Sequence, residues 1–207
     1  MNTRQVQTAL NALGFPCGAV DGLVGRRTRG ATARFQLAYN VGTRLAVDGV
    51  AGPLTTRALT QAADTRRLSP HFSVAELRSG GDGTCYVHRS LLTALETMRA
   101  RLGRPVVLRS GWRDPAHNRR VGGASASQHA YGTAAELARL GGTVDLGPHG
   151  VRAGRAADLV AGYADLATVR GLRLFSGIGH RGTGTPWVMH VDTRTGATPA
   201  APIVWRY

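Results

Sequence analysis

The stretch Ser127-Gln-His129-Ala-Tyr-Gly132-Thr-Ala134-Ala-Glu136 carries an imidazole and a carboxylate seven positions apart. A second imidazole follows far downstream, in the apolar segment His190-Val-Asp192. Two histidines and one carboxylate form the ligand set of a catalytic zinc ion that keeps a fourth position for water. We therefore predict a zinc hydrolase in which His129, Glu136 and His190 are the ligands.

The bulk composition is that of a globular protein. The chain has 207 residues, of which 43% are hydrophobic and 18% are charged, enough for one ordinary domain and a small one. Because no apolar run approaches roughly 18 residues, no membrane span is predicted. The first residues, Met1-Asn-Thr-Arg-Gln-Val-Gln-Thr, lack the basic and apolar regions of a secretory signal. We therefore expect synthesis in a cytoplasm.

The net charge of +14 comes from arginine alone, since the sequence contains no lysine. Such a charge attracts polyanions, which include nucleic acids and the phosphate-rich polymers of a bacterial wall. The arginines stand singly or in pairs and form neither a basic helix nor a strand with interleaved aromatic residues. Specific nucleic-acid recognition is therefore not expected.

An internal repeat occupies the first third of the chain. Residues 19–28, AVDGLVGRRT, recur as residues 46–55, AVDGVAGPLT. Each Asp-Gly pair predicts a tight turn with a glycine at positive φ, and each closing threonine is placed to cap a helix. The predicted helices cover residues 5–13, 28–39 and 55–62, which together form a small three-helix domain.

The remainder predicts an α+β domain after a linker at residues 64–70. Helices are expected near Ser73, over residues 90–102, near His117 and over 151–169, and strands over 105–110, 175–179 and 188–191. Residues 133–147 predict a hairpin around Gly141-Gly142. Cys17 and Cys85 are too far apart in sequence to form a metal-binding pair.

The repeat resembles the peptidoglycan-binding module found on many wall hydrolases. The matching positions lie within residues 3–62 and include Leu13-Gly14-Phe15, Phe35-Gln36 and both Val-Asp-Gly turns. The resemblance implies that residues 1–63 are a peptidoglycan-binding domain, with a groove for glycan or stem peptide.

Residues 71–207 resemble the zinc D,D-carboxypeptidase and endopeptidase family that includes peptidase M15 enzymes and many phage endolysins. The matching segments are His71-Phe72-Ser73, Ser110-Gly111-Trp112-Arg113, Val121-Gly122-Gly123, residues 127–136, Gly177-Ile178-Gly179 and His190-Val191-Asp192. The resemblance implies a zinc peptidase domain with a mainly antiparallel sheet and flanking helices. It also implies that His129 and His190 bind Zn²⁺ and that Arg113 binds the substrate and stabilises its oxyanion.

The third ligand has three candidates. The family has Asp where this chain has Glu136, and the extra methylene moves the carboxylate oxygens by about 1.5 Å. Asp145 lies in a similar Gly-Gly-Thr-Val-Asp context and is the alternative to Glu136. Asp158 matches the pattern in an alanine-rich, helical context and ranks third.

The sequence also leaves more than one candidate for the general base. Several relatives carry an acid three residues before the last histidine ligand, where this chain has Trp187. Asp192 is a candidate base, and it is equally a candidate for a carboxylate that orients a metal-bound imidazole.

The predicted function is a monomeric peptidoglycan hydrolase, in the setting of a phage endolysin that acts on the wall after release from the cytoplasm. It would use a zinc-activated water to cleave an amide in the stem peptide or cross-link, and anionic wall polymers are further candidate partners. The alternative is a wall-binding protein whose peptidase domain is degenerate, suggested by Glu136 and Trp187.

Overall fold

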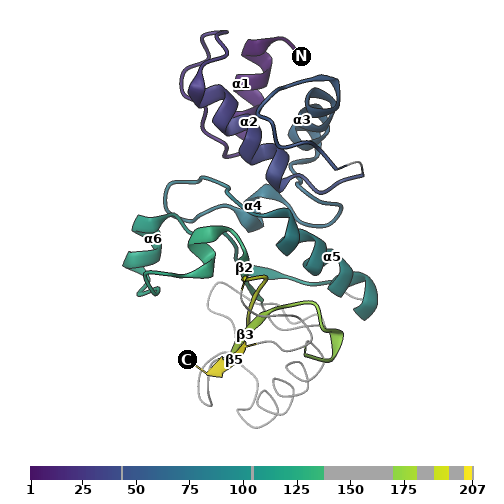
Figure 1. Cartoon of the computed structure of the whole chain (residues 1–207), viewed down its shortest axis with the longest axis vertical. Coiled ribbons are helices and arrows are strands. Elements are labelled where there is room, and N and C mark those ends of the chain that lie inside the picture. Colours follow the sequence, from purple (N-terminus) through teal and green to yellow (C-terminus); the bar gives the residue numbers. More distant parts are fainter. Residues whose placement is uncertain (43, 104, 138–169, 181–188, 196–202, 207) are drawn as a thin grey trace. The chain divides into compact units, whose positions relative to one another are not determined.

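The computed structural model describes residues 1–42, 44–103, 105–137, 170–180, 189–195 and 203–206 (Figure 1). The predicted second strand of the 133–147 hairpin and the helix over 151–169 lie outside these residues, as do Asp145, Asp158 and Trp187. Within the described residues, no helix is long and apolar enough to cross a membrane. The chain divides into two compact units, residues 1–93 with 110–133, and residues 94–109 with 134–207.

The first unit begins with three helices, as the sequence predicts: α1 (Thr3–Ala12), α2 (Arg26–Ala38) and α3 (Pro53–Thr65). The predicted threonine caps are wrong. Gly25 and Gly52 occupy the N-cap positions of α2 and α3, and neither makes a side-chain cap. Thr28 and Thr55 lie inside the helices and are buried.

Those threonines belong to a hydrogen-bond cluster that the repeat duplicates. Gln7 Nε2 donates to Asp21 Oδ1 at 2.8 Å and to Thr28 Oγ1 at 3.2 Å. Its Oε1 accepts from the backbone N of Gly22, which has φ +82°. Gln36 makes the corresponding bonds to Asp48, Thr55 and Gly49. A buried amide thus holds each Asp-Gly turn against a helix, because its donors and acceptor are all used.

Residues 64–70, predicted as a linker, pack within the first unit. Helix α3 runs to Thr65, and Leu68 and Ser69 have no exposed surface. The backbone N of Asn40 donates to the Leu68 carbonyl at 2.7 Å. Residues 64–70 therefore contribute to the first unit. The division into domains at residues 1–63 and 71–207 stays a prediction.

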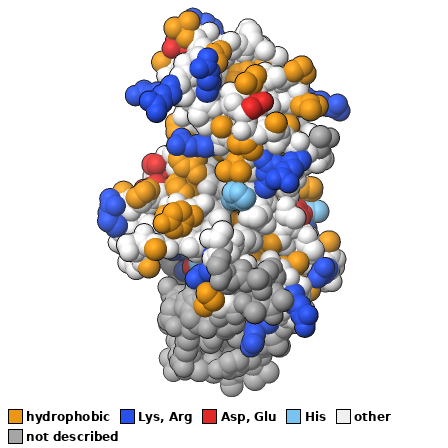
Figure 2. All heavy atoms as spheres, in the orientation of Figure 1, with side chains coloured by type: hydrophobic (Ala, Val, Ile, Leu, Met, Phe, Trp, Pro, Cys, Tyr) orange, Lys and Arg blue, Asp and Glu red, His pale blue; other side chains and the backbone are white. Residues whose placement is uncertain are grey.

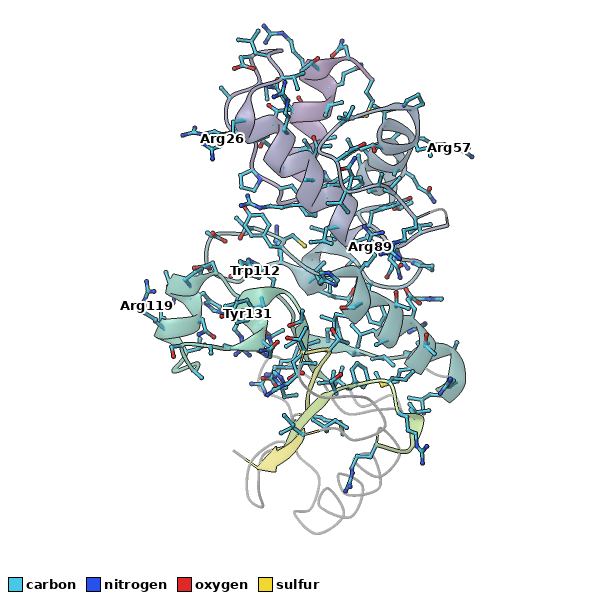
Figure 3. The ribbon with its side chains drawn as sticks, in the orientation of Figure 1. Arg26, Arg57, Arg89, Trp112, Arg119 and Tyr131 are labelled. Atoms are coloured by element: carbon cyan, nitrogen blue, oxygen red, sulfur yellow. The ribbon has the colours of Figure 1, made fainter. Side chains whose placement is uncertain are left out.

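Two arginines join the three-helix region to the segment that follows it. Arg89 is 8% exposed, and its guanidinium donates to the carbonyls of Gln36 at 3.0 Å and Leu45 at 3.3 Å. Arg34 lies 4.3 Å from the ring centroid of Tyr86 and donates to its hydroxyl. In Figure 3, Arg89 lies among the packed elements, whereas other labelled arginines extend outward. These contacts fix the three-helix region to residues 86–89.

The rest of the first unit is formed by short elements: α4 (Val74–Leu77), the first turns of α5 (Arg89–Leu102), α6 (Pro115–Arg120) and the 3₁₀ helix η1 (Gln128–Tyr131). The predicted cap of α4 is confirmed, because Ser73 and Glu76 form a reciprocal capping box. Asp114 caps α6 by accepting from the backbone N of His117 at 2.9 Å.

The second unit is built on a five-stranded sheet with the order β1-β2-β4-β3-β5. The strands are β1 (Leu108–Ser110), β2 (Ala134–Leu137), β3 (Gly177–His180), β4 (Met189–Asp192) and β5 (Ile203–Arg206). β4 pairs antiparallel with β2 and β3, and β5 runs parallel to β3. The predicted mainly antiparallel sheet is confirmed, while β5 was not expected and β1 is shorter than predicted.

One face of this sheet is apolar. Ala135 and Leu137 on β2, Ile178 on β3, and Met189 and Val191 on β4 are each at most 1% exposed. Because side chains alternate along a strand, the positions between them point to the other face. On β2 and β4 those positions are Ala134, Glu136, His190 and Asp192, so the chemistry-bearing residues share one face.

Candidate metal centre

His129 is presented by a tight turn. It lies in η1, which Ser127 precedes as N-cap and which ends at Gly132 with φ +71°. The Nδ1 atom of His129 lies 2.7 Å from the Gly111 carbonyl, an acceptor only, so Nδ1 carries a proton and donates. The lone pair of the neutral ring is therefore on Nε2, which is the atom that can bind a metal.

Gly132 is required by the segment that passes over the turn. A Cβ at this position would collide with the carbonyl oxygen of Tyr86, and the positive φ already disfavours other residues. The backbone N of His88 donates to the Gly132 carbonyl at 2.8 Å. The glycine of the quoted stretch thus allows residues 86–88 to hold the His129 turn.

Glu136 and His190 face each other across two paired strands. They are register partners in the antiparallel pair of β2 and β4. Directly opposed residues point to the same side of a sheet with their Cβ atoms close together. His190 Nδ1 lies 3.6 Å from Glu136 Oε1, and the two residues are 7% and 8% exposed.

Asp192 sets which nitrogen of His190 faces Glu136. Its Oδ2 lies 3.0 Å from His190 Nε2, and Asp192 has no exposed surface. A carboxylate accepts, so Nε2 carries a proton, and in the neutral ring the lone pair is on Nδ1. Each histidine therefore directs a lone-pair nitrogen by bonding its other nitrogen to an oxygen, as metal-binding histidines do.

His129, Glu136 and His190 each offer one ligand atom, and these atoms lie within 4.8 Å of one another. A tetrahedral zinc ion with ligands at about 2.1 Å separates its ligand atoms by about 3.4 Å. The 3.6 Å between His190 Nδ1 and Glu136 Oε1 is close to that value. Two neutral imidazoles and a buried carboxylate also suit zinc chemically. The donor set fits a zinc ion.

The electrostatics favour a cation at this place. Burial would lower the pKa of His190, but its interactions with Asp192 and Glu136 outweigh burial and raise that pKa. Burial would likewise raise the pKa of Asp192, while hydrogen bonds from Arg194 and His190 hold it at about 2. Both carboxylates thus favour positive charge at His190, either a proton or a divalent ion that replaces it.

Arg113 lies on the loop after β1, next to the His129 turn. Its backbone N donates to the His129 carbonyl at 3.2 Å, and its Nε donates to Ser110 Oγ at 3.1 Å. The carboxylate of the neighbouring Asp114 accepts from the backbone N of His117 and from Ser79 Oγ, and these hydrogen bonds lower its pKa to about 2. Arg113 is half-buried and is held beside the turn by Ser110.

Other titratable residues lie outside this group. His117 on α6 is half-buried, and its Nδ1 lies 2.9 Å from Arg120 Nη2. Cys17 and Cys85 are both buried free thiols. Burial raises the pKa of Cys85 to about 12, so it stays protonated and is no nucleophile.

The sequence analysis assigned no role to two residues near His190. Arg194 bonds to Asp192 through its guanidinium, and Gly177 lies opposite Asp192 on β3. The spacing Asp192-x-Arg194 was the available signal, because residues two apart on an extended segment point to the same side.

Comparison with known proteins agrees with both resemblances. Residues 2–59 match the model of a peptidoglycan binding domain, and residues 70–146 match that of peptidase M15. A zinc D-Ala-D-Ala carboxypeptidase of Streptomyces albus G is 39% identical over 130 residues, covering 58% of this chain. The chain spans about half the length of that relative, 49%. The chain is therefore similar to a peptidoglycan-binding domain over residues 2–59 and to peptidase M15 over residues 70–146.

Proposed function

We propose that the chain is a zinc peptidase that hydrolyses an amide bond in the peptides of bacterial peptidoglycan. The observation that carries this proposal is the pairing of His190 Nδ1 with Glu136 across β2 and β4, in one group with His129. Glu136 is proposed as the third ligand, in the place where the family has Asp. Asp145, outside the described residues, remains the alternative.

The proposed division of labour follows from the contacts. When bound, zinc lowers the pKa of a water toward about 7 and polarises the scissile carbonyl. His129, Glu136 and His190 hold the ion, and each imidazole is oriented by its second nitrogen. Arg113 binds a substrate carboxylate or the developing oxyanion with its guanidinium. Asp192 is buried and bonded to His190 and Arg194, which supports an orienting role over that of a general base.

The substrate is proposed from the two domains together. A peptidoglycan-binding domain keeps the enzyme on a sparse polymer and raises the local substrate concentration. The relative from Streptomyces albus G is a D-Ala-D-Ala carboxypeptidase, so the terminal D-Ala–D-Ala bond of the stem peptide is the first candidate. In that case Arg113 would pair with the terminal carboxylate.

The basic surface supports a further attraction to anionic wall polymers. Arginines stand singly or in small groups over the face drawn in Figure 2, and the net charge is +14. Such a surface favours association with polyanions at low salt. The phage endolysin setting, with lysis after release from the cytoplasm, stays a prediction from the sequence, as does the monomeric state.

Digestion of purified peptidoglycan tests the function. We expect the zinc-loaded protein to shorten pentapeptide stems by one D-Ala, because its relative has that specificity. The new termini are found by mass spectrometry of the released muropeptides. EDTA should stop the reaction and added zinc should restore it, since the activated water depends on the metal.

Two other outcomes are informative. Loss of cross-linked dimers without loss of terminal D-Ala would show that the protein is an endopeptidase and not a carboxypeptidase. A zinc-loaded protein that sediments with peptidoglycan but makes no new terminus would contradict the proposed peptidase activity. It would support the alternative, a wall-binding protein with a degenerate peptidase domain.

A further inference from the structure

The carboxylate behind His190 is itself held by an arginine. Arg194 Nε lies 2.8 Å from Asp192 Oδ1 and 3.0 Å from Oδ2, and its Nη2 also donates to Oδ2. The backbone N of Arg194 donates to Asp192 Oδ1 at 3.1 Å. A two-residue step along the chain thus places a guanidinium across both oxygens of a fully buried carboxylate. This fork fixes the plane of the carboxylate, which a point charge would not do.

The space for this pair is provided by a glycine. Gly177 is the register partner of Asp192 on β3. A Cβ at position 177 would lie 2.5 Å from both carboxylate oxygens of Asp192 and 2.6 Å from Arg194 Nε. Any side chain there must displace the carboxylate or the guanidinium. The requirement is steric, because the backbone of Gly177 is not in the left-handed region.

The same arrangement continues to His190. The next glycine of the strand, Gly179, is the register partner of His190, and Ile178 between them is buried on the other face. β3 therefore offers no side chain at either position opposite His190 and Asp192. The segment Gly177-Ile178-Gly179 is thus explained by the space that the two residues on β4 require.

We propose that Arg194 and Gly177 are positioning residues for the metal centre. Arg194 holds the Asp192 carboxylate so that it accepts from His190 Nε2, and Gly177 leaves the room for this contact. The consequence is that His190 keeps one tautomer and turns Nδ1 toward Glu136. The proposal rests on the proposed zinc function. Behind the ligand His190 and the carboxylate of Asp192 that orients it, it adds the residues that position this carboxylate.

The expected result is weaker zinc binding without loss of fold. Changes to residues behind a metal ligand cost about 10- to 100-fold in affinity. We expect Arg194→Gln to raise the zinc Kd about tenfold or more, measured by competition with a chromophoric chelator. Arg194→Lys should weaken binding less, because it keeps the charge and loses the fork. Gly177→Ala should act in the same direction by moving the pair.

The chain offers matched controls in the same unit. Arg109 on β1 is exposed, and Gly171 has no atom within 4 Å of an added Cβ. Arg109→Gln and Gly171→Ala should leave the zinc Kd unchanged. Thermal unfolding followed by circular dichroism in EDTA shows that each variant folds.

A spectroscopic measurement separates positioning from a general loss of structure. Nitrogen-15 shifts of the metal-free protein, recorded at a pH high enough for the His190 ring to be neutral, should show His190 protonated at Nε2 in the wild type. They should show mixed tautomers in Arg194→Gln, because the orientation of Asp192 is lost. Wild-type zinc affinity and a single tautomer in Arg194→Gln would overturn the proposal and leave the zinc function intact. A wild-type protein that binds no zinc would overturn both.

Discussion

Changing His129 to alanine is expected to lower kcat/KM for stem-peptide cleavage at least about 1,000-fold and to remove tightly bound zinc. The ion supplies several kcal/mol of transition-state stabilisation, and each step of about 1.4 kcal/mol is a factor of ten in rate. His129 is 1% exposed, and its Nδ1 is bonded to the Gly111 carbonyl. The alanine variant therefore removes Nε2, the nitrogen that would bind the metal. Initial rates on a synthetic stem peptide and zinc analysis by mass spectrometry measure the two effects.

His117→Ala is the control for this change. His117 is half-buried on α6 and contacts Arg120, outside the group of three metal-binding candidates. Its replacement should leave both zinc content and rate near the wild-type values. A His129→Ala protein that keeps its zinc and cleaves at the wild-type rate would show that the metal, or the reaction, lies elsewhere.

Changing Arg113 to lysine is expected to lower kcat/KM about 100-fold while zinc content stays unchanged. Removing one donor to a developing oxyanion costs about 100- to 1,000-fold, and lysine keeps the charge but loses the planar fork. Ser110 Oγ accepts from Nε and holds the guanidinium beside the His129 turn. Lysine has no equivalent of Nε, so this anchor is also lost.

The exposed Arg119, which extends outward from α6 in Figure 3, provides the matched control. Arg119→Lys should behave as the wild type in steady-state assays. If Arg113→Lys cleaves as fast as Arg119→Lys, the proposed contact with substrate is wrong. If Arg113→Lys loses zinc, the role of Arg113 is structural.

In residues 127–136, the spacing of the residues predicted more of the metal site than the residue types alone did. His129 on a turn and Glu136 on the next strand follow from the glycine that ends the turn and from the alternation of β2. His190 could be placed on an apolar strand, and the register with β2 then brings it opposite Glu136. Pairing between strands more than 50 residues apart is a tertiary feature, so it needed the structure.

What the sequence could not predict are contacts made after packing. Thr28 and Thr55 were expected as helix caps, yet each accepts a hydrogen bond from a glutamine on the preceding helix. The clamp of Arg194 on Asp192 depends on the absence of a side chain at Gly177, on another strand. The parallel strand β5 is short and follows a segment rich in alanine and proline, so periodicity gave no signal for it.

Zinc analysis of three proteins tests the central claim most directly: the wild type, Glu136→Ala and Asp145→Ala, each dialysed against metal-free buffer. We expect about one zinc ion per chain in the wild type and in Asp145→Ala, and almost none in Glu136→Ala. The reason is that Glu136 is the carboxylate that faces His190 Nδ1. Retention of zinc in Glu136→Ala together with its loss in Asp145→Ala would contradict the account.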